Sequence, residues 1–153
     1  MKKTVENGIL FEDVTRMLNE GIQVTLTVKG RSMSPYIRHA KDSVVLAKAD
    51  SEKLAVGDIV LAKTTQGQFV LHRIIRLEGE KAVLMGDGNL KGTENCLQSD
   101  IRGKVLFIER RGRRTDCNTP CQRRKAAVLR SIHRTYLRTR HFFGNILRKL
   151  HLR

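Results

Sequence analysis

The sequence has few of the residues that mark exported, disulfide-bonded or membrane-spanning proteins. It contains no tryptophan, two prolines and three cysteines, and no stretch approaches the roughly 20 apolar residues that span a bilayer. At the N-terminus, acidic and polar residues follow Lys2 and Lys3 where a signal peptide would have an apolar run. We therefore expect a cytoplasmic protein that is either soluble or peripheral at the inner face of the membrane.

The small number of cysteines argues against metal or redox chemistry. Cys96, Cys117 and Cys121 form an odd set in a chain without an export signal, so reduced thiols are the default. The stretch "CNTPC", residues 117–121, offers two thiols, which is half of a four-ligand zinc site. We expect no metal and no cofactor.

Acidic residues are nearly absent from the last part of the chain. Residues 1–109 contain 16 Lys and Arg against 14 Asp and Glu, which gives +2, whereas residues 110–153 contain 14 against Asp116 alone, which gives +13. The pattern predicts a near-neutral domain with a strongly basic tail. A chain of 153 residues has room for one domain with a real core.

The near-neutral part has the pattern of antiparallel β structure. Apolar positions in residues 9–20 predict a short amphipathic helix that Gly21 ends, and "IQVTLTVK" then alternates as a half-buried strand does. Further short apolar runs follow between glycine-containing turns: "SVVLAK", "DIVLAK", "FVLHRII", "KAVLM" and "GKVLFIER". We expect a mainly β fold, a small, twisted, partly closed antiparallel domain over residues 1–109 with one N-terminal helix.

The basic part predicts a linker over residues 110–120 and an amphipathic helical tail over residues 121–153. Its apolar residues recur at helical spacings among many arginines: Leu129, Ile132, Tyr136, Phe143, Ile146 and Leu150. Such a helix could lie on an anionic membrane surface or cover the apolar edge of its own β domain. Nucleic acid fits less well, because the tail's aromatics follow the apolar stripe and do not form a base-stacking platform.

A candidate nucleophile lies in the turn "GRSMSP", residues 30–35, after the first strand. The hydroxyl of Ser32 would need a neighbouring base for acyl transfer. His72, within "FVLHRII", is a candidate base, although its position on an apolar strand, taken alone, favours a satisfied core residue. Asp87, within "MGDGN", could hold the imidazole in the required tautomer. His39 has no expected role.

The segments "GRSMSP", "VGDIVLAK", "VLHRII", "GDGN" and "IRGKV", in this order, resemble the type I signal peptidase and LexA-type serine peptidase superfamily over most of residues 21–108. A histidine at position 72 is similar to the endoplasmic-reticulum and archaeal branch. The resemblance implies a LexA-like β fold, Ser32 as nucleophile with its backbone amide in the oxyanion hole, and His72 as general base. Its acid matches Asp87, or Glu94 a little further along.

The resemblance implies a serine endopeptidase that processes leader or signal-like peptides, whose partner is a peptide with an extended cleavage segment. Signal peptidases carry a transmembrane anchor before the serine, where this sequence predicts an amphipathic helix. We therefore expect a standalone processing peptidase. The alternative is a module without catalysis that keeps the fold and binds peptides or a membrane surface.

Overall fold

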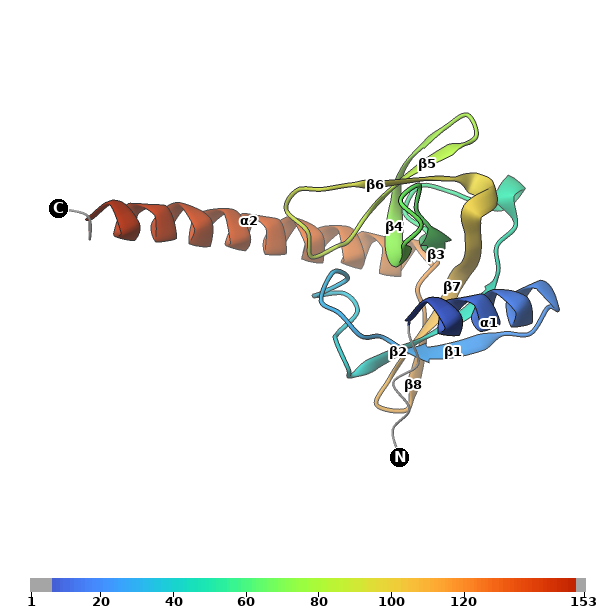
Figure 1. The fold of residues 1–153 in the computed structure, drawn as a ribbon. Coiled ribbons are helices and arrows are strands. Elements are labelled where there is room, and N and C mark those ends of the chain that lie inside the picture. The colour runs from blue at the N-terminus through green and yellow to red at the C-terminus, as the bar shows by residue number, and fades with distance from the viewer. Residues whose placement is uncertain (1–6, 151–153) are drawn as a thin grey trace.

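The structure, a computed structural model, describes residues 7–150 and contains one sheet and two α-helices in that range (Figure 1). The helices are α1 (Asn7–Asn19) and α2 (Pro120–Leu150). The strands are β1 (Val24–Thr27), β2 (Asp42–Lys48), β3 (Ile59–Lys63), β4 (Phe69–Glu78), β5 (Lys81–Met85), β6 (Glu94–Leu97), β7 (Ile101–Arg110) and β8 (Arg113–Asp116). Two 3₁₀ turns complete the order, η1 (Ser51–Lys53) and η2 (Gln98–Asp100).

The strands form a single antiparallel sheet, which confirms the predicted mainly β class. Their order is β1-β2-β7-β3-β4-β5-β6, and β8 pairs with β7 beside this path. The sheet curls strongly, so that β4, β5 and β6 stand roughly across from α1, β1 and β2 (Figure 1). It stays open, since β1 and β6 are the two ends of the path.

Both faces of the central strand β3 are buried, because side chains alternate across a strand. Ile59 and Leu61 belong to a first core that also takes residues from α1, β2, β7 and the Ser32 turn. Val60 and Ala62 belong to a second core under β4, β5 and β6. The curled sheet thus lies between two apolar clusters, and β3 accordingly has an uninterrupted apolar sequence over residues 59–62.

The predicted N-terminal helix is confirmed. Val14 and Leu18, one turn apart on α1, are buried in the first core. Gly103 on β7 permits this close packing, because a Cβ there would lie 2.8 Å from Leu18 Cδ1. Gly21, with a φ of +80°, ends the helix in the left-handed conformation that glycine adopts most easily.

The segment predicted as a linker, residues 110–120, is instead largely part of the sheet. β7 runs through to Arg110, and β8 pairs with it from Phe107↔Asp116 to Arg110↔Arg113. Arginine-rich composition suggested a solvated linker, but the turn at Arg111 and Gly112, both with positive φ, makes a tight hairpin. The expected boundary after residue 109 therefore falls inside a pair of strands.

The predicted basic helix is confirmed as α2, and its two halves have different surroundings. Pro120 opens it, Thr119 Oγ1 caps it by accepting from the Gln122 N–H at 3.3 Å, and Ala126 is buried in the first core. The far end of the helix extends beyond the sheet (Figure 1). The side chains of Phe143, Ile146 and Leu150 lie outside the described residues. Neither helix, as far as described, has an apolar stretch long enough to span a membrane.

Candidate active site

Ser32 lies in a turn that the first core holds in place. Gly30, with a φ of +107°, turns the chain after β1, and its N–H donates to Nδ1 of His39 at 2.8 Å. The Ser34–Pro35 peptide bond is cis. Three side chains of the turn are buried in the first core: Met33, Tyr36 and Ile37. The turn is therefore anchored on both sides of its serine.

The hydroxyl and the backbone N–H of Ser32 are both available to a ligand. Ser32 is partly exposed, and among the described residues neither its hydroxyl nor its N–H forms a hydrogen bond. Its carbonyl oxygen, by contrast, accepts from the Gly88 N–H at 2.7 Å. The hydroxyl of Ser34, two residues on, already donates to the Ile37 carbonyl at 3.4 Å. Of the two serines in the turn, Ser32 is the one with unused polar groups.

His72 is oriented by a carboxylate from another strand. It lies on β4 opposite Val60, is buried, and its Nδ1 is 2.8 Å from Oε2 of Glu94 on β6. Because an ionised carboxylate only accepts hydrogen bonds, this contact places the ring proton on Nδ1. In the neutral ring Nε2 then has the lone pair, which is the state that a general base requires.

The glycine turn after β5 packs against the Ser32 turn. Arg73 on β4 pairs with Met85, the last residue of β5, and Gly86 follows directly. A Cβ on Gly86 would lie 3.0 Å from Ser32 Cβ and 2.5 Å from Ser32 O, and one on Gly88 would lie 2.8 Å from the Arg31 carbonyl oxygen. Both glycines are thus needed for this close approach. No hydrogen bond joins the hydroxyl of Ser32 to His72 in the described structure.

The other candidate acid, Asp87, has arginine partners and is not bonded to His72. Its buried carboxylate accepts from Arg73 Nε at 2.8 Å and Nη2 at 2.6 Å, and from Arg130 Nη1 at 3.3 Å. Burial holds the pKa of Arg130 below its ordinary value, against the attraction of Asp87. Of the two acids that the sequence left open, Glu94 is the one in contact with the imidazole.

Arg73 is a site residue to which the sequence assigned no role. It is buried, donates from Nη1 to the Gly57 carbonyl at 2.8 Å, and lies over the ring of Tyr36 with its Cζ 5.3 Å from the centroid. Burial, the main cause, raises the pKa of Tyr36 to about 12. Arg73 thereby ties β4 to the Asp87 turn and to the Ser32 turn. The clue in the sequence was an arginine on a buried strand, which needs an acid nearby.

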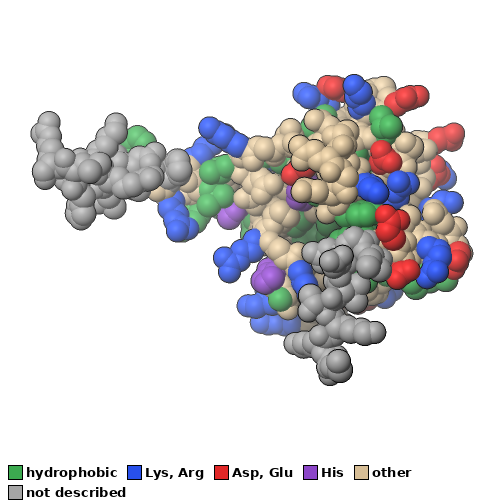
Figure 2. All heavy atoms as spheres, in the orientation of Figure 1, with side chains coloured by type: hydrophobic (Ala, Val, Ile, Leu, Met, Phe, Trp, Pro, Cys, Tyr) green, Lys and Arg blue, Asp and Glu red, His purple; other side chains and the backbone are tan. Residues whose placement is uncertain are grey.

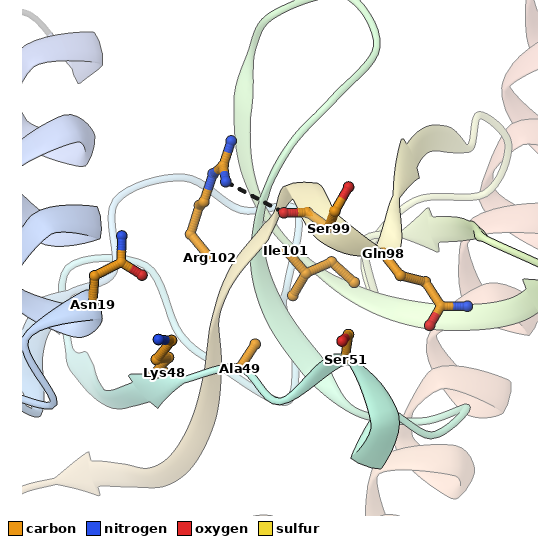
Figure 3. Close-up of a pocket in the computed structure, with 8 residues that line it drawn as sticks. All are labelled: Asn19, Lys48, Ala49, Ser51, Gln98, Ser99, Ile101 and Arg102. Carbon is orange, nitrogen blue, oxygen red and sulfur yellow. Dashed lines mark hydrogen bonds between the residues drawn. The ribbon is translucent and has the colours of Figure 1, made fainter.

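A cavity of about 150 Å³ lies elsewhere, between the end of α1, the end of β2 and η2 (Figure 3). Lys48 and Arg102 line it with two serines, Ser51 and Ser99, and Arg102 Nη1 donates to the Ser99 carbonyl at 3.3 Å. Its lining contains no histidine and no carboxylate. Neither serine hydroxyl is hydrogen-bonded to Lys48 or to another base in the described structure, so this cavity is a poorer place for acyl transfer than the Ser32 turn.

The cysteines do not form a common site. Cys117 is buried in the first core, where burial raises its pKa to about 11, while Cys121 is exposed on α2. Across residues 7–150, as far as their side chains are described, no three His, Cys, Asp or Glu side chains are grouped as metal ligands.

Comparison of the sequence with known protein families and with curated proteins found no match. The function must therefore be inferred from the residues of the site and from the motifs in which they occur. The site has three relevant features: an unbonded serine hydroxyl, a buried imidazole, and a carboxylate. The carboxylate contacts Nδ1 of His72, whereas in a catalytic triad Nε2 takes the serine proton.

Proposed function

We propose that the protein is a serine endopeptidase of the type I signal peptidase and LexA-type superfamily, and that it cuts leader or signal-like peptides. The observations that carry the proposal are the 2.8 Å contact between His72 Nδ1 and Glu94, and the packing of the Ser32 turn against Gly86, directly after the strand that pairs with β4. A core histidine without catalytic work would also need a partner, so the unbonded hydroxyl of Ser32 is the second feature that supports the proposal.

In the proposed reaction, Ser32 Oγ attacks the carbonyl carbon of the scissile peptide bond. Nε2 of His72 takes the hydroxyl proton during the attack and later gives it to the leaving amine. Glu94 holds the proton on Nδ1 and stabilises the imidazolium that forms. The Ser32 N–H donates to the oxyanion of the tetrahedral intermediate. Water then hydrolyses the acyl-enzyme by the same steps, which restores the serine.

The two acids have separate roles in this proposal. Glu94 orients the base directly. Asp87, paired with buried Arg73, keeps the turn that contains Gly86 and Gly88 against the Ser32 turn, so it is a positioning residue. Of the two acids that the family resemblance leaves open, this proposal gives the orienting role to Glu94.

An extended peptide could reach Ser32 along β1. β1 is an end strand of the sheet, and the chain continues from it through Gly30 directly to Ser32. A substrate that pairs with the outer edge of β1 as an added strand would deliver a peptide bond towards the serine turn. Backbone hydrogen bonds would then supply affinity, and shallow contacts with alternate side chains would supply selectivity.

The test is turnover of a mixed peptide library by the full chain, with products identified by mass spectrometry. Ser32→Ala and His72→Ala should each abolish nearly all cleavage, and the double variant should be little worse than either, because the two groups share one proton transfer. His39→Ala is the matched control: its exposed ring only accepts from Gly30, so cleavage should change by less than about tenfold.

Independent, multiplicative losses in the double variant would contradict a shared step. A Ser32→Ala variant that still cleaves would remove the proposal altogether. If the full chain binds peptides from the library without cleaving any, the alternative of a peptide-binding module with this fold takes its place.

A further inference from the structure

The first half of α2 is fixed to the sheet by arginines on one helix face. Arg123 contacts the buried carboxylate of Asp58, Arg130 contacts Asp87, and Arg134 Nη2 lies 3.2 Å from the sulfur of Met85. Ala126 and Leu129 add apolar contacts to the first core from neighbouring positions. These residues recur at spacings of three, four and seven, which places them along one side of the helix.

A second stripe on α2 faces away from the sheet and is apolar. Val128, Ile132 and Tyr136, each one turn apart, are exposed by 57%, 62% and 57%. At about 100° per residue this stripe lies roughly opposite Arg123, Arg130 and Arg134. Folding therefore does not bury it. Leu129, which the sequence placed in the same stripe, packs on the core instead.

The charge around the exposed stripe identifies what could cover it. Residues 117–153 contain no Asp or Glu, and exposed basic side chains border the stripe: Arg124, Lys125, Arg138 and Arg140. Where the helix leaves the sheet, basic and hydrophobic side chains lie together, while acidic side chains gather on the far half of the body (Figure 2). A second copy of this helix would bring like charges together, so self-association along the stripe is disfavoured.

We propose that the Val128, Ile132 and Tyr136 stripe of α2 binds the surface of an anionic phospholipid membrane. The apolar side chains would enter the boundary between headgroups and acyl chains, and the bordering arginines and lysine would contact lipid phosphates. Nucleic acid would use the same charges but has no place for Val128 and Ile132. The arginines that hold α2 to the sheet face the other way, so the body would stay docked on the helix.

The test is flotation of the full chain with vesicles of equal parts phosphatidylglycerol and phosphatidylcholine, and with phosphatidylcholine alone. We expect binding to the anionic vesicles only, weakened by salt. Ile132→Glu should weaken it roughly tenfold or more, because an inserted isoleucine contributes at least that factor. Ser131→Glu introduces the same negative charge at the next exposed position, outside the stripe, and should weaken binding much less.

Ile132→Lys separates insertion from charge attraction, since it adds a positive charge while removing the apolar side chain. Weaker binding than wild type supports insertion. Equal or stronger binding by Ile132→Lys overturns the proposal. It is also overturned if the wild-type chain does not bind anionic vesicles at low salt, or if it forms a dimer that Ile132→Lys converts to a monomer. Tighter binding to duplex DNA than to the vesicles, retained in Ile132→Lys, would make nucleic acid the partner.

Ser32→Ala should bind vesicles as the wild type does, because no contact in the described structure joins the stripe to Ser32. Membrane binding and peptidase activity can therefore fail separately. Unchanged thermal unfolding of the position 131 and 132 variants, both at exposed sites, checks that any loss of binding is not a loss of folding.

Discussion

Neutralising the two acids one at a time should give opposite outcomes, because their surroundings differ. In Asp87→Asn, Arg73 loses the carboxylate that receives two of its hydrogen bonds, at 2.8 and 2.6 Å, and both side chains are at most 3% exposed. Breaking a buried ion pair by removing one partner costs about 3–5 kcal/mol. In a chain of this length that corresponds to a fall in melting temperature of about 6–20 °C.

Glu94→Gln should leave the fold nearly intact and remove activity. The Glu94 side chain is 32% exposed, so its contact with His72 is partly screened by solvent and contributes little to stability. The amide that replaces the carboxylate would keep a hydrogen bond but no longer stabilise the imidazolium. We expect peptide turnover to fall by about 10²–10⁴-fold, with a melting temperature close to that of the wild type.

The measurements are thermal unfolding by circular dichroism and the initial rate on one cleaved peptide, for both variants at neutral pH. Asp87→Asn should melt early, yet at a temperature where it is still folded it should keep more activity than Glu94→Gln. A stable but inactive Asp87→Asn together with a fully active Glu94→Gln would refute the assignment of the two roles.

Three further predictions concern the supports of the site and of the fold. Gly86→Ala should lower turnover strongly with a smaller effect on melting temperature, since its Cβ would collide with Ser32 O at 2.5 Å. Gly67→Ala is the control for a glycine change in a turn: no atom lies within 4 Å, and its φ of +81° strains an alanine away from the Ser32 turn, so the melting temperature should fall while turnover stays close to that of the wild type. Equal activities of the two variants would contradict the close-approach argument. Ending the chain after Glu109 should leave little stability, because charged hydrogen bonds from Arg110, Arg123 and Arg130 to buried acids are lost, each contributing about 1.5–3 kcal/mol. A chain ending after Arg138 should have a melting temperature close to that of the full chain. Similar melting temperatures for the two truncated chains would contradict the stabilising role of these arginines. Burial would raise the pKa of Asp42, but hydrogen bonds from Arg110 and Arg38 outweigh burial and hold that pKa below its usual value. The stability from this carboxylate is therefore present above the unfolded pKa of about 3.9 and is lost as the pH falls through the lower folded pKa. The difference in melting temperature between wild type and Asp42→Asn should shrink on acidification, and a constant difference would contradict this prediction.

Both helices and six of the eight described strands could be predicted from local patterns, because each carries its own periodicity, whereas β6, which contains Glu94, and β8 were not predicted. Alternation in residues 22–29 and the buried pairs in α1 carry their periodicity in the sequence. Strand β8 could not be found this way: "RRGRRTD" is polar throughout, and it is a strand only because β7 offers it a partner. Pairing of that kind depends on the tertiary fold.

The site was predictable as a set of segments and less so as a set of contacts. The motifs placed Ser32, His72 and the glycine turn in a plausible order, but two acids stood within reach of the imidazole. What separates them is Arg73, whose side chain shares a strand with His72 but points to the opposite face and engages Asp87. Choosing between Asp87 and Glu94 therefore required knowing which face of β4 each acid meets.

The buried carboxylates Asp42, Asp58 and Asp87 give the order of synthesis a physical consequence. Each accepts from one basic residue within the first 109 and from one arginine that follows: Arg110, Arg123 and Arg130. A chain emerging from the ribosome exposes the acids long before these arginines appear. The sheet then carries under-neutralised acids until Arg110, Arg123 and Arg130 have emerged, so its final packing waits until the first half of α2 has been made.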